Sequence, residues 1–441
     1  MKHLKQLYKL LLLTSLILFL PACGGGGNDD PTEEDINAVS VKTYGAIGDS
    51  TTDDTQAFIN AFANETSVLI PEGNYLITSA LTVPSTLHII TGSGTIKGTS
   101  PNGVLILDSQ GTGIKHLKIN GITFQYQPTT DSKFGAIYFN DSDVKNLTIQ
   151  NCHFISQSNA KWGNAIALVG KKKHKIDNIQ IINNTFTNIT RAAIEILVRG
   201  NDTKKSGEFP EWPAVNFDST IVTNLSIDGN TFIHNRNTYR MPNNEIFNPA
   251  ISLSGAVNGT HIKNNNINGY YWGIELDGSV NTKITDNKIT TKHSALSITH
   301  GADPKVGKTI IERNTLSASE VEGTNVINTH SARNISIRKN TITGLMYLWE
   351  TNNFKIEDNK FYSKQYTNIV IKDSKKCIIT KNYIENTNTA SNGSIRGRGH
   401  SDSSNRVTHN KIYLKKQNGV ITNDTGASVV FENNELLITP Q

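Results

Sequence analysis

The chain has 441 residues, of which 36% are hydrophobic, 7% aromatic and 18% charged. This composition is too apolar for a disordered chain, and 12 Pro and three Cys exclude a collagen-like or disulfide-stapled scaffold. The formal net charge is only +5, which is too mild to indicate a nucleic-acid partner. Asparagine is unusually frequent, at roughly 50 residues. Because Asn favours turns and left-handed backbone, the composition predicts many short strands joined by tight turns.

Residues 1–22 are predicted to be a signal peptide. Lys2, Lys5 and Lys9 precede an apolar run that is too short to span a bilayer comfortably and ends just before Cys23. This pattern resembles a bacterial lipoprotein signal, which implies lipidation of Cys23; the alternative is an ordinary secretory signal. Residues 23–39 follow as a flexible acidic tether. We therefore expect a protein of the bacterial cell envelope, held in the outer membrane by its lipid anchor with a periplasmic or surface orientation, or else secreted.

Residues 40–67 are predicted to form an N-terminal cap. A Gly-rich loop is followed by a short amphipathic helix from Asp53 to Glu65, and residues 68–75 read as strand, turn and strand. This segment resembles the N-terminal motif of the pectin-lyase-like β-helix superfamily, which includes polygalacturonases, other glycoside hydrolases and phage tailspikes. The resemblance implies an all-β, right-handed parallel β-helix. It leaves the activity open, because that superfamily holds hydrolases, lyases, epimerases and binding spikes.

The rest of the chain repeats a short apolar strand followed by Asn at a turn. In the C-terminal half these Asn residues lie 19 to 28 residues apart, at Asn287, Asn314, Asn340, Asn359, Asn382 and Asn410. Each unit is too small to bury its own apolar face, so the units must stack. The repeat predicts a single β-helix domain over residues 40–441, with Asn ladders from coil to coil. Cys152 and Cys377 lie in strand-like runs and are expected to be buried free thiols.

Apolar residues alternate along the predicted strands, so the residues between them face outward. The resulting outer surface is acidic in the middle and basic toward the C-terminus. Its predicted substrate-binding residues are Glu195, Ser252, His330, Tyr347, Trp349, Lys372, Arg396 and Arg398. Aromatic rings that stack on sugars, together with cations that pair with anionic groups, suit an anionic polysaccharide.

The run Glu275-Leu276-Asp277 carries the sharpest chemical signal. Two carboxylates two residues apart on a strand have Cα atoms about 6.5–7 Å apart on the same face. Their repulsion is expected to raise one pKa, which leaves one proton donor and one base. The spacing also fits the room that an inverting glycosidase leaves for water, about 6.5–9.5 Å between carboxyls. A solvated strand face, on which Glu-x-Asp is common, is the alternative.

His300 ends the strand-like run one coil later, where it is expected to lie beside Asp277. A carboxylate-x-carboxylate strand followed by a strand that ends in His resembles the active-site stretch of the iota-carrageenases, which are inverting β-helix hydrolases of a sulphated galactan. The resemblance implies Glu275 as the general acid, Asp277 as the general base and His300 as an assisting residue. Where that family has a Gln on the preceding coil, this chain has Ser252.

Two other functions fit the same surface. A polysaccharide lyase acting on a uronic-acid polymer would use Lys372, Arg396 or His330 as the base, with Ca²⁺ on the carboxylates, but Lys372 lies four coils from Asp277, about 20 Å. A non-catalytic surface lipoprotein that binds glycan is the third reading. The hydrolase requires no cofactor, although the fold has room for a structural Ca²⁺ or Na⁺ ion. We expect a monomer with no nucleic-acid partner.

Overall fold

The computed structural model describes residues 37–107, 113–132, 134–140, 142–157, 163–170, 174–198, 221–236, 248–255, 257–299, 307–319, 324–365, 367–388, 394–414 and 421–438. From Ala38 onward the described residues form one compact unit. No helix among them is long and apolar enough to cross a membrane. Two predicted functional residues, Cys23 and His300, lie outside the described residues.

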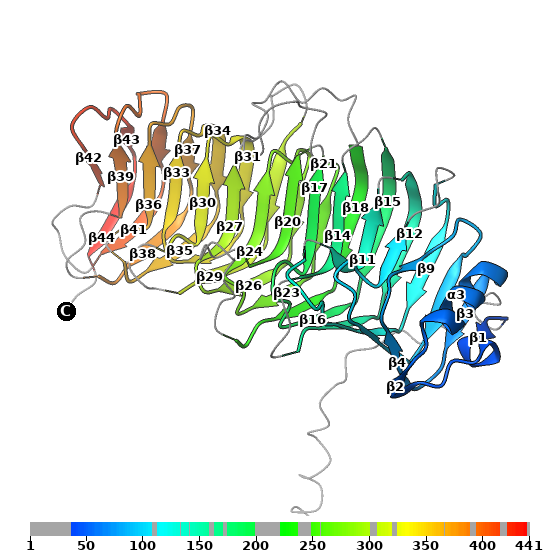
Figure 1. Ribbon diagram of the computed structural model, residues 1–441. Coiled ribbons are helices and arrows are strands. Elements are labelled where there is room, and N and C mark those ends of the chain that lie inside the picture. The colour runs from blue at the N-terminus through cyan, green and yellow to red at the C-terminus, as the bar shows by residue number, and fades with distance from the viewer. Residues whose placement is uncertain are drawn as a thin grey trace, which may run out of the picture. The chain divides into compact units, whose positions relative to one another are not determined.

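Three parallel sheets run along a solenoid, as Figure 1 shows. In the described part of the chain the first sheet has 16 strands, from β1 (Val39–Ser40) and β3 (Ser67–Ile70) to β43 (Val430–Glu432). The second has 15, from β2 (Asp49–Asp53) and β4 (Asn74–Ile77) to β44 (Glu435–Ile438). Each strand in the interior of a sheet pairs in parallel with the strand one coil earlier and the strand one coil later, so the predicted parallel β-helix is confirmed.

The third sheet carries the candidate site. Its 13 described strands are, in spatial order, β5 (Leu81–Thr82), β8 (Leu105–Leu107), β11 (Gly135–Asn140), β14 (Asn164–Gly170), β17 (Ile194–Val198), β20 (Pro249–Gly255), β24 (Trp272–Asp277), β27 (Ser294–Thr299), β30 (Ile327–His330), β33 (Met346–Trp349), β36 (Ile369–Lys372), β39 (Ile395–Arg398) and β42 (Ile421–Asn423). Because spatial order follows chain order, residues 19 to 57 apart in sequence become neighbours, as in the pairs Asn328–Tyr347 and Glu195–Ser252.

The core of the solenoid consists of columns of like side chains. In the first sheet Ile262, Ile284 and Ile311 are paired in register and fully buried. In the second sheet aromatic rings stack with centroids 4.7–5.0 Å apart and planes 7° apart, at Phe124, Phe154, Phe186 and Phe232. A strict two-residue alternation turns these side chains inward in every coil and leaves the residues between them on the outer faces.

An Asn ladder closes the turn between the first and second sheets. From the second member onward, each Asn side-chain oxygen accepts hydrogen bonds from the backbone N–H and the amide of the Asn one coil before, at 2.8–3.0 Å. The members are Asn184, Asn230, Asn265, Asn287, Asn314, Asn340, Asn359, Asn382, Asn410 and Asn434. The ladder confirms the predicted role of the Asn excess.

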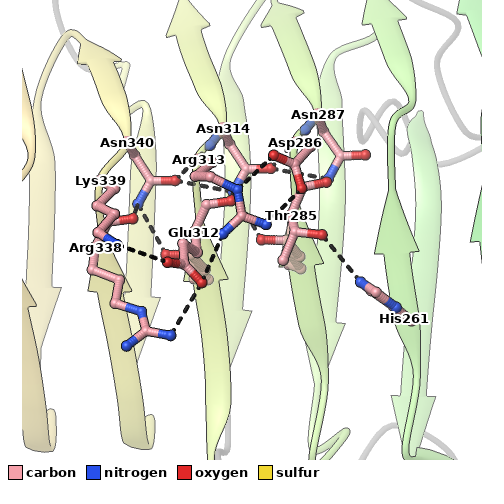
Figure 2. A network of polar contacts seen from close by, with 12 residues as sticks. His261, Thr285, Asp286, Asn287, Glu312, Arg313, Asn314, Arg338, Lys339 and Asn340 are labelled. Carbon is pink, nitrogen blue, oxygen red and sulfur yellow. Dashed lines mark hydrogen bonds and ion pairs between the residues drawn. The ribbon is translucent and has the colours of Figure 1, made fainter.

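The residue before each ladder Asn has left-handed backbone, for example Arg313 with φ 57° and Lys339 with φ 56°. Figure 2 shows that this places charged side chains beside the ladder, where Arg313 pairs with Asp286 and Glu312 contacts Arg338. The turn geometry therefore produces a row of ion pairs along one edge of the first sheet.

A short helix, α3 (Thr55–Asn64), packs at the N-terminal end, close to the predicted bounds Asp53–Glu65. Phe58 and Phe62 of α3 are buried, and the ring of Phe58 meets Tyr75 of β4 at 5.4 Å. The predicted capping helix is thus confirmed. Cys152 and Cys377 are buried and free, also as predicted, and burial raises the pKa of the Cys152 thiol to about 12.

Candidate active site

The outer face of the third sheet carries the candidate residues in two columns. The register places in one column Glu195, Ser252, Glu275, Ser297, Asn328, Tyr347, Val370 and Arg396. The second column contains Asp277, Thr299, His330, Trp349, Lys372 and Arg398. Between them on β24 lies Leu276, which is buried in the core together with Ile274. The two columns reproduce the predicted order of charges, acidic in the middle and basic toward β39.

The Glu275 carboxyl is partly buried between neighbouring strands. Ser252 of β20 donates a hydrogen bond from its Oγ to Oε2 of Glu275 at 2.7 Å. Burial raises the pKa of Glu275; the hydrogen bond from Ser252 opposes this rise, the negative charge of Asp277 adds to it, and the positive charge of Arg191 opposes it. A carboxyl that holds its proton to higher pH suits a general acid.

Asp277 is less accessible than the alternation predicts, because only 7% of it is exposed. It accepts a hydrogen bond from Oγ1 of Thr299 at 2.8 Å, and Thr299 is its register partner on β27. Thr299 therefore occupies the position beside Asp277 that the sequence analysis gave to His300. Sequence reasoning missed Thr299, although aligning Leu276 with Ile298 would have found it. The assisting role of His300 stays a prediction.

The prediction that Glu195 is exposed was wrong. Only 3% of Glu195 is exposed, and both of its carboxylate oxygens bind the guanidinium of Arg191. Nδ2 of Asn164 donates a further hydrogen bond to Glu195 at 2.8 Å. Ser252, expected to contact substrate, is likewise buried, with 2% exposed, and its hydroxyl serves Glu275 instead. Burial removes both from the open face.

Arg191 and Asn164 are members of this cluster that sequence reasoning missed. Arg191 lies just before β17, on a turn with no regular alternation, and Asn164 begins β14 one coil earlier. Neither position carries a periodic signal, so the pairing with Glu195 follows only from the three-dimensional register.

An aromatic and cationic stack lies farther along the second column. The rings of His330 and Trp349 stack with centroids 4.2 Å apart, and Nζ of Lys372 lies 4.7 Å from the Trp349 ring centroid. His330 precedes Trp349 in the column and Lys372 follows it. Tyr347, two residues earlier on β33, lies in the first column.

Two arginines share one carboxylate near the end of the sheet. Nε of Arg396 and Nε of Arg398 donate to the two oxygens of Asp424 at 2.7 and 3.0 Å. The hydrogen bond from Arg396 is the main cause of the lowered pKa of Asp424, which favours the ionised carboxylate. The cluster therefore contains two cations and one anion. Such an oriented pair of guanidinium groups suits sulphate or carboxylate groups of a ligand.

The structure brings Ser252, Glu275 and Asp277 together and keeps the cations apart from them. Lys372 lies four strand steps from Asp277 and Arg398 five, which corresponds to about 19 and 24 Å at the usual strand spacing. In the described ranges, no three side chains of His, Cys, Asp or Glu are grouped so that they could hold a metal ion.

Comparison with known proteins finds similarity to a β-helix family and to phage proteins. The family model described as a right handed beta helix region matches residues 272–436, which include both carboxylates. Segments of pre-neck appendage proteins are similar in sequence: that of Bacillus phage B103 is 38% identical over 93 residues, covering 19% of this chain and 11% of the phage protein. That of Bacillus phage phi29 is 32% identical over 127 residues, covering 26% and 14%. This chain therefore matches only a small part of the length of each relative.

Several solved structures of low sequence identity are similar to this chain. The N-terminal fragment of bacteriophage phi29 gene product 12 has a TM-score of 0.50 at 15% identity, over 90% of this chain and 65% of that one. The adhesin PfbA of Streptococcus pneumoniae has a TM-score of 0.49 at 15% identity, over 88% and 91%. The catalytic unit of an α-1,3-glucanase from Streptomyces thermodiastaticus has 0.48 at 15%, over 90% and 70%. The family model and the phage fragment agree with the right-handed β-helix predicted from the sequence.

Proposed function

We propose that this protein is a glycoside hydrolase that cleaves an anionic polysaccharide with inversion. One observation carries the proposal: Glu275, whose pKa is raised by burial, lies two residues from Asp277 on the outer face of β24. Two carboxyls with different surroundings on one strand can divide the roles of acid and base. Strand geometry sets their Cα atoms about 6.5–7 Å apart, and an inverting mechanism requires carboxyl groups about 6.5–9.5 Å apart with a water between them.

In this mechanism Glu275 donates its proton to the glycosidic oxygen of the leaving group. Asp277 takes a proton from the water that attacks the opposite face of the sugar, while the hydrogen bond from Thr299 holds its carboxylate in place. His300 is retained as a proposed assisting residue. Each proton transfer contributes about 10²- to 10⁴-fold to the rate.

For the substrate we propose a sulphated polymer of the carrageenan type. Lys372, Arg396 and Arg398 lie on the same outer face as the carboxylates, and Asp424 orients the two guanidinium groups. The repeat of the solenoid suits a linear chain that lies along the columns. The signal-like segment supports a location in the bacterial cell envelope, tethered through Cys23.

The deciding experiment is a screen of the full chain on carrageenans, pectins, alginate and glycosaminoglycans. New reducing ends with no unsaturated sugar, abolished in Glu275→Gln, support the hydrolase. An ultraviolet-absorbing unsaturated product that survives in Glu275→Gln and is lost in Lys372→Ala points to the lyase instead. Binding without any product, equal in the parent and Glu275→Gln, identifies a glycan-binding surface and removes the enzyme proposal.

A further inference from the structure

A buried ion pair lies two coils before Glu275. Arg191 and Glu195 are each less than a tenth exposed, and Asn164 adds a hydrogen bond to the carboxylate. Burying two charges is costly, and breaking such a pair is more costly still. Glu195 belongs to the outer column of the third sheet, and the β-helix fold does not require a charged residue at this position. The closeness of the pair to Glu275 therefore suggests a role in the candidate site.

The register connects this pair directly to Glu275. Glu195, Ser252 and Glu275 are consecutive members of one column, so Ser252 stands one strand spacing from each carboxylate and the two lie about 10 Å apart. The Ser252 hydroxyl donates to Glu275. The oxygens of Glu195 accept from Arg191 and Asn164 instead, so Glu195 does not depend on Ser252 for a hydrogen bond.

The charges that face Glu275 are few in the part of the chain that the structure describes. Asp277 lies on its own strand, and Arg191 and Glu195 lie two coils away. The register neighbours on the two flanking strands, Ser252 and Ser297, are neutral. The negative charge of Asp277 and the positive charge of Arg191 therefore act on Glu275 in opposite directions.

We propose that the Arg191–Glu195 pair is a positioning element that directs the Ser252 hydroxyl to Glu275 and balances the charge of Asp277. The catalytic consequence rests on the proposed function, but the effect on the carboxyl does not. Removing the cation in Arg191→Gln leaves two carboxylates near Glu275, whereas removing the anion in Glu195→Gln leaves an unpaired cation. The two variants should move the pKa of Glu275 in opposite directions, each by about one pH unit at this distance.

The test titrates Glu275 without any substrate. Protein labelled with ¹³C at the glutamate carboxyls is followed by NMR, and Glu275→Gln identifies the signal. We expect an upward shift in Arg191→Gln, a downward shift in Glu195→Gln and recovery toward the parent value in Arg191→Lys. Arg313→Gln removes a cation from an ion pair on the first sheet and should leave the signal unmoved. Shifts of equal sign, or no shift in either variant, overturn the proposal.

A second variant covers the case in which a single change prevents folding. Arg191→Met combined with Glu195→Leu removes both charges, which buried pairs often tolerate. Because the two opposite effects then cancel, the pKa of Glu275 should stay close to the parent value. A shift of about one pH unit in this variant overturns the proposal, because the pair would then not act on Glu275 through two opposing charges. If the pKa shifts appear but no polysaccharide is cleaved, the positioning role stands and only the proposed function fails.

Discussion

Glu275 and Asp277 lie two residues apart, yet each accepts its own hydrogen bond, from Ser252 and Thr299 respectively. Gln and Asn keep an oxygen that accepts the same bond, so Glu275→Gln and Asp277→Asn should fold like the parent. Each should lose about 10²- to 10⁴-fold in turnover, because each removes one proton transfer. Steady-state kinetics and thermal unfolding measure the two effects. Variants that unfold at the parent temperature and keep near-normal turnover would contradict the assignment of acid and base.

The raised pKa of Glu275 also predicts how stability depends on pH. Because burial lifts the pKa above its ordinary 4.5, the folded state holds this proton more tightly than the unfolded chain. The stability from this proton is full below pH 4.5 and is lost as the pH rises through the raised pKa. The side chain in Glu275→Gln does not titrate. The free energy of unfolding of this variant should therefore increase relative to that of the parent as the pH rises through the pKa of Glu275. Urea unfolding at a series of pH values measures the difference in free energy of unfolding between variant and parent. A relative stability of the variant that increases toward acid pH would refute the expectation.

Single residues show where sequence reasoning succeeds and fails. Alternation placed Glu275 and Asp277 correctly on one outer face, because the side-chain period of a strand is fixed by its geometry. The same alternation gave a wrong exposure for Glu195. It predicts on which side of the sheet a side chain lies, but not whether other residues cover that side chain. Arg191, which covers it, comes from an irregular turn that carries no period.

The turn between the first and second sheets sets the stability of each coil. Asn314 accepts two hydrogen bonds from Asn287 and donates its amide to Ile284, Glu312 and Asn340. Asn314→Ala leaves buried partners unsatisfied at about 1–3 kcal/mol each, so the free energy of unfolding should fall by at least about 2 kcal/mol.

Asn268, which is exposed at the end of β23 (Asn266–Asn268), provides the matched control for Asn314. Asn268→Ala should change the free energy of unfolding by less than about 0.5 kcal/mol, because within the described ranges its exposed side chain makes no hydrogen bond to a buried group. Denaturant unfolding compares the two variants. Equal losses in both would mean that the ladder contributes nothing beyond the ordinary loss of an Asn.

At the level of elements, the repeat could be predicted from the sequence because the same Asn-containing turn recurs from coil to coil. The spacing of Asn287, Asn314 and Asn340 predicted both the solenoid and the ladder, since only stacked coils satisfy a buried amide at each turn. The assignment of strands to three separate sheets was not predicted, because each coil's three strands are short and share one apolar pattern.

For the whole molecule, the first segment predicts attachment to a membrane through Cys23. Lipidation requires this thiol, so Cys23→Ser should move the protein from the membrane fraction to the soluble fraction of cells that produce it. Fractionation with an antibody against the chain measures the distribution. Parent and variant that fractionate alike would refute lipidation and favour an ordinary secretory signal.

The separation between the carboxylates and the cations predicts a dependence on the length of the substrate. Arg398 lies five strand steps from Asp277, about 24 Å along the sheet, so a short oligosaccharide bound at Glu275 does not reach it. Arg396→Ala with Arg398→Ala should raise KM on the polymer and flatten its salt dependence, while kcat/KM on the shortest cleaved oligosaccharides stays at the parent value. Lys283→Ala, which removes an exposed cation from the first sheet, is the control and should change neither. Kinetics on size-fractionated oligosaccharides of the polymer identified by the screen provide the measurement. An equal loss on short and long chains would mean that the two arginines act on the fold or on Glu275 itself rather than on a distant part of the bound polysaccharide.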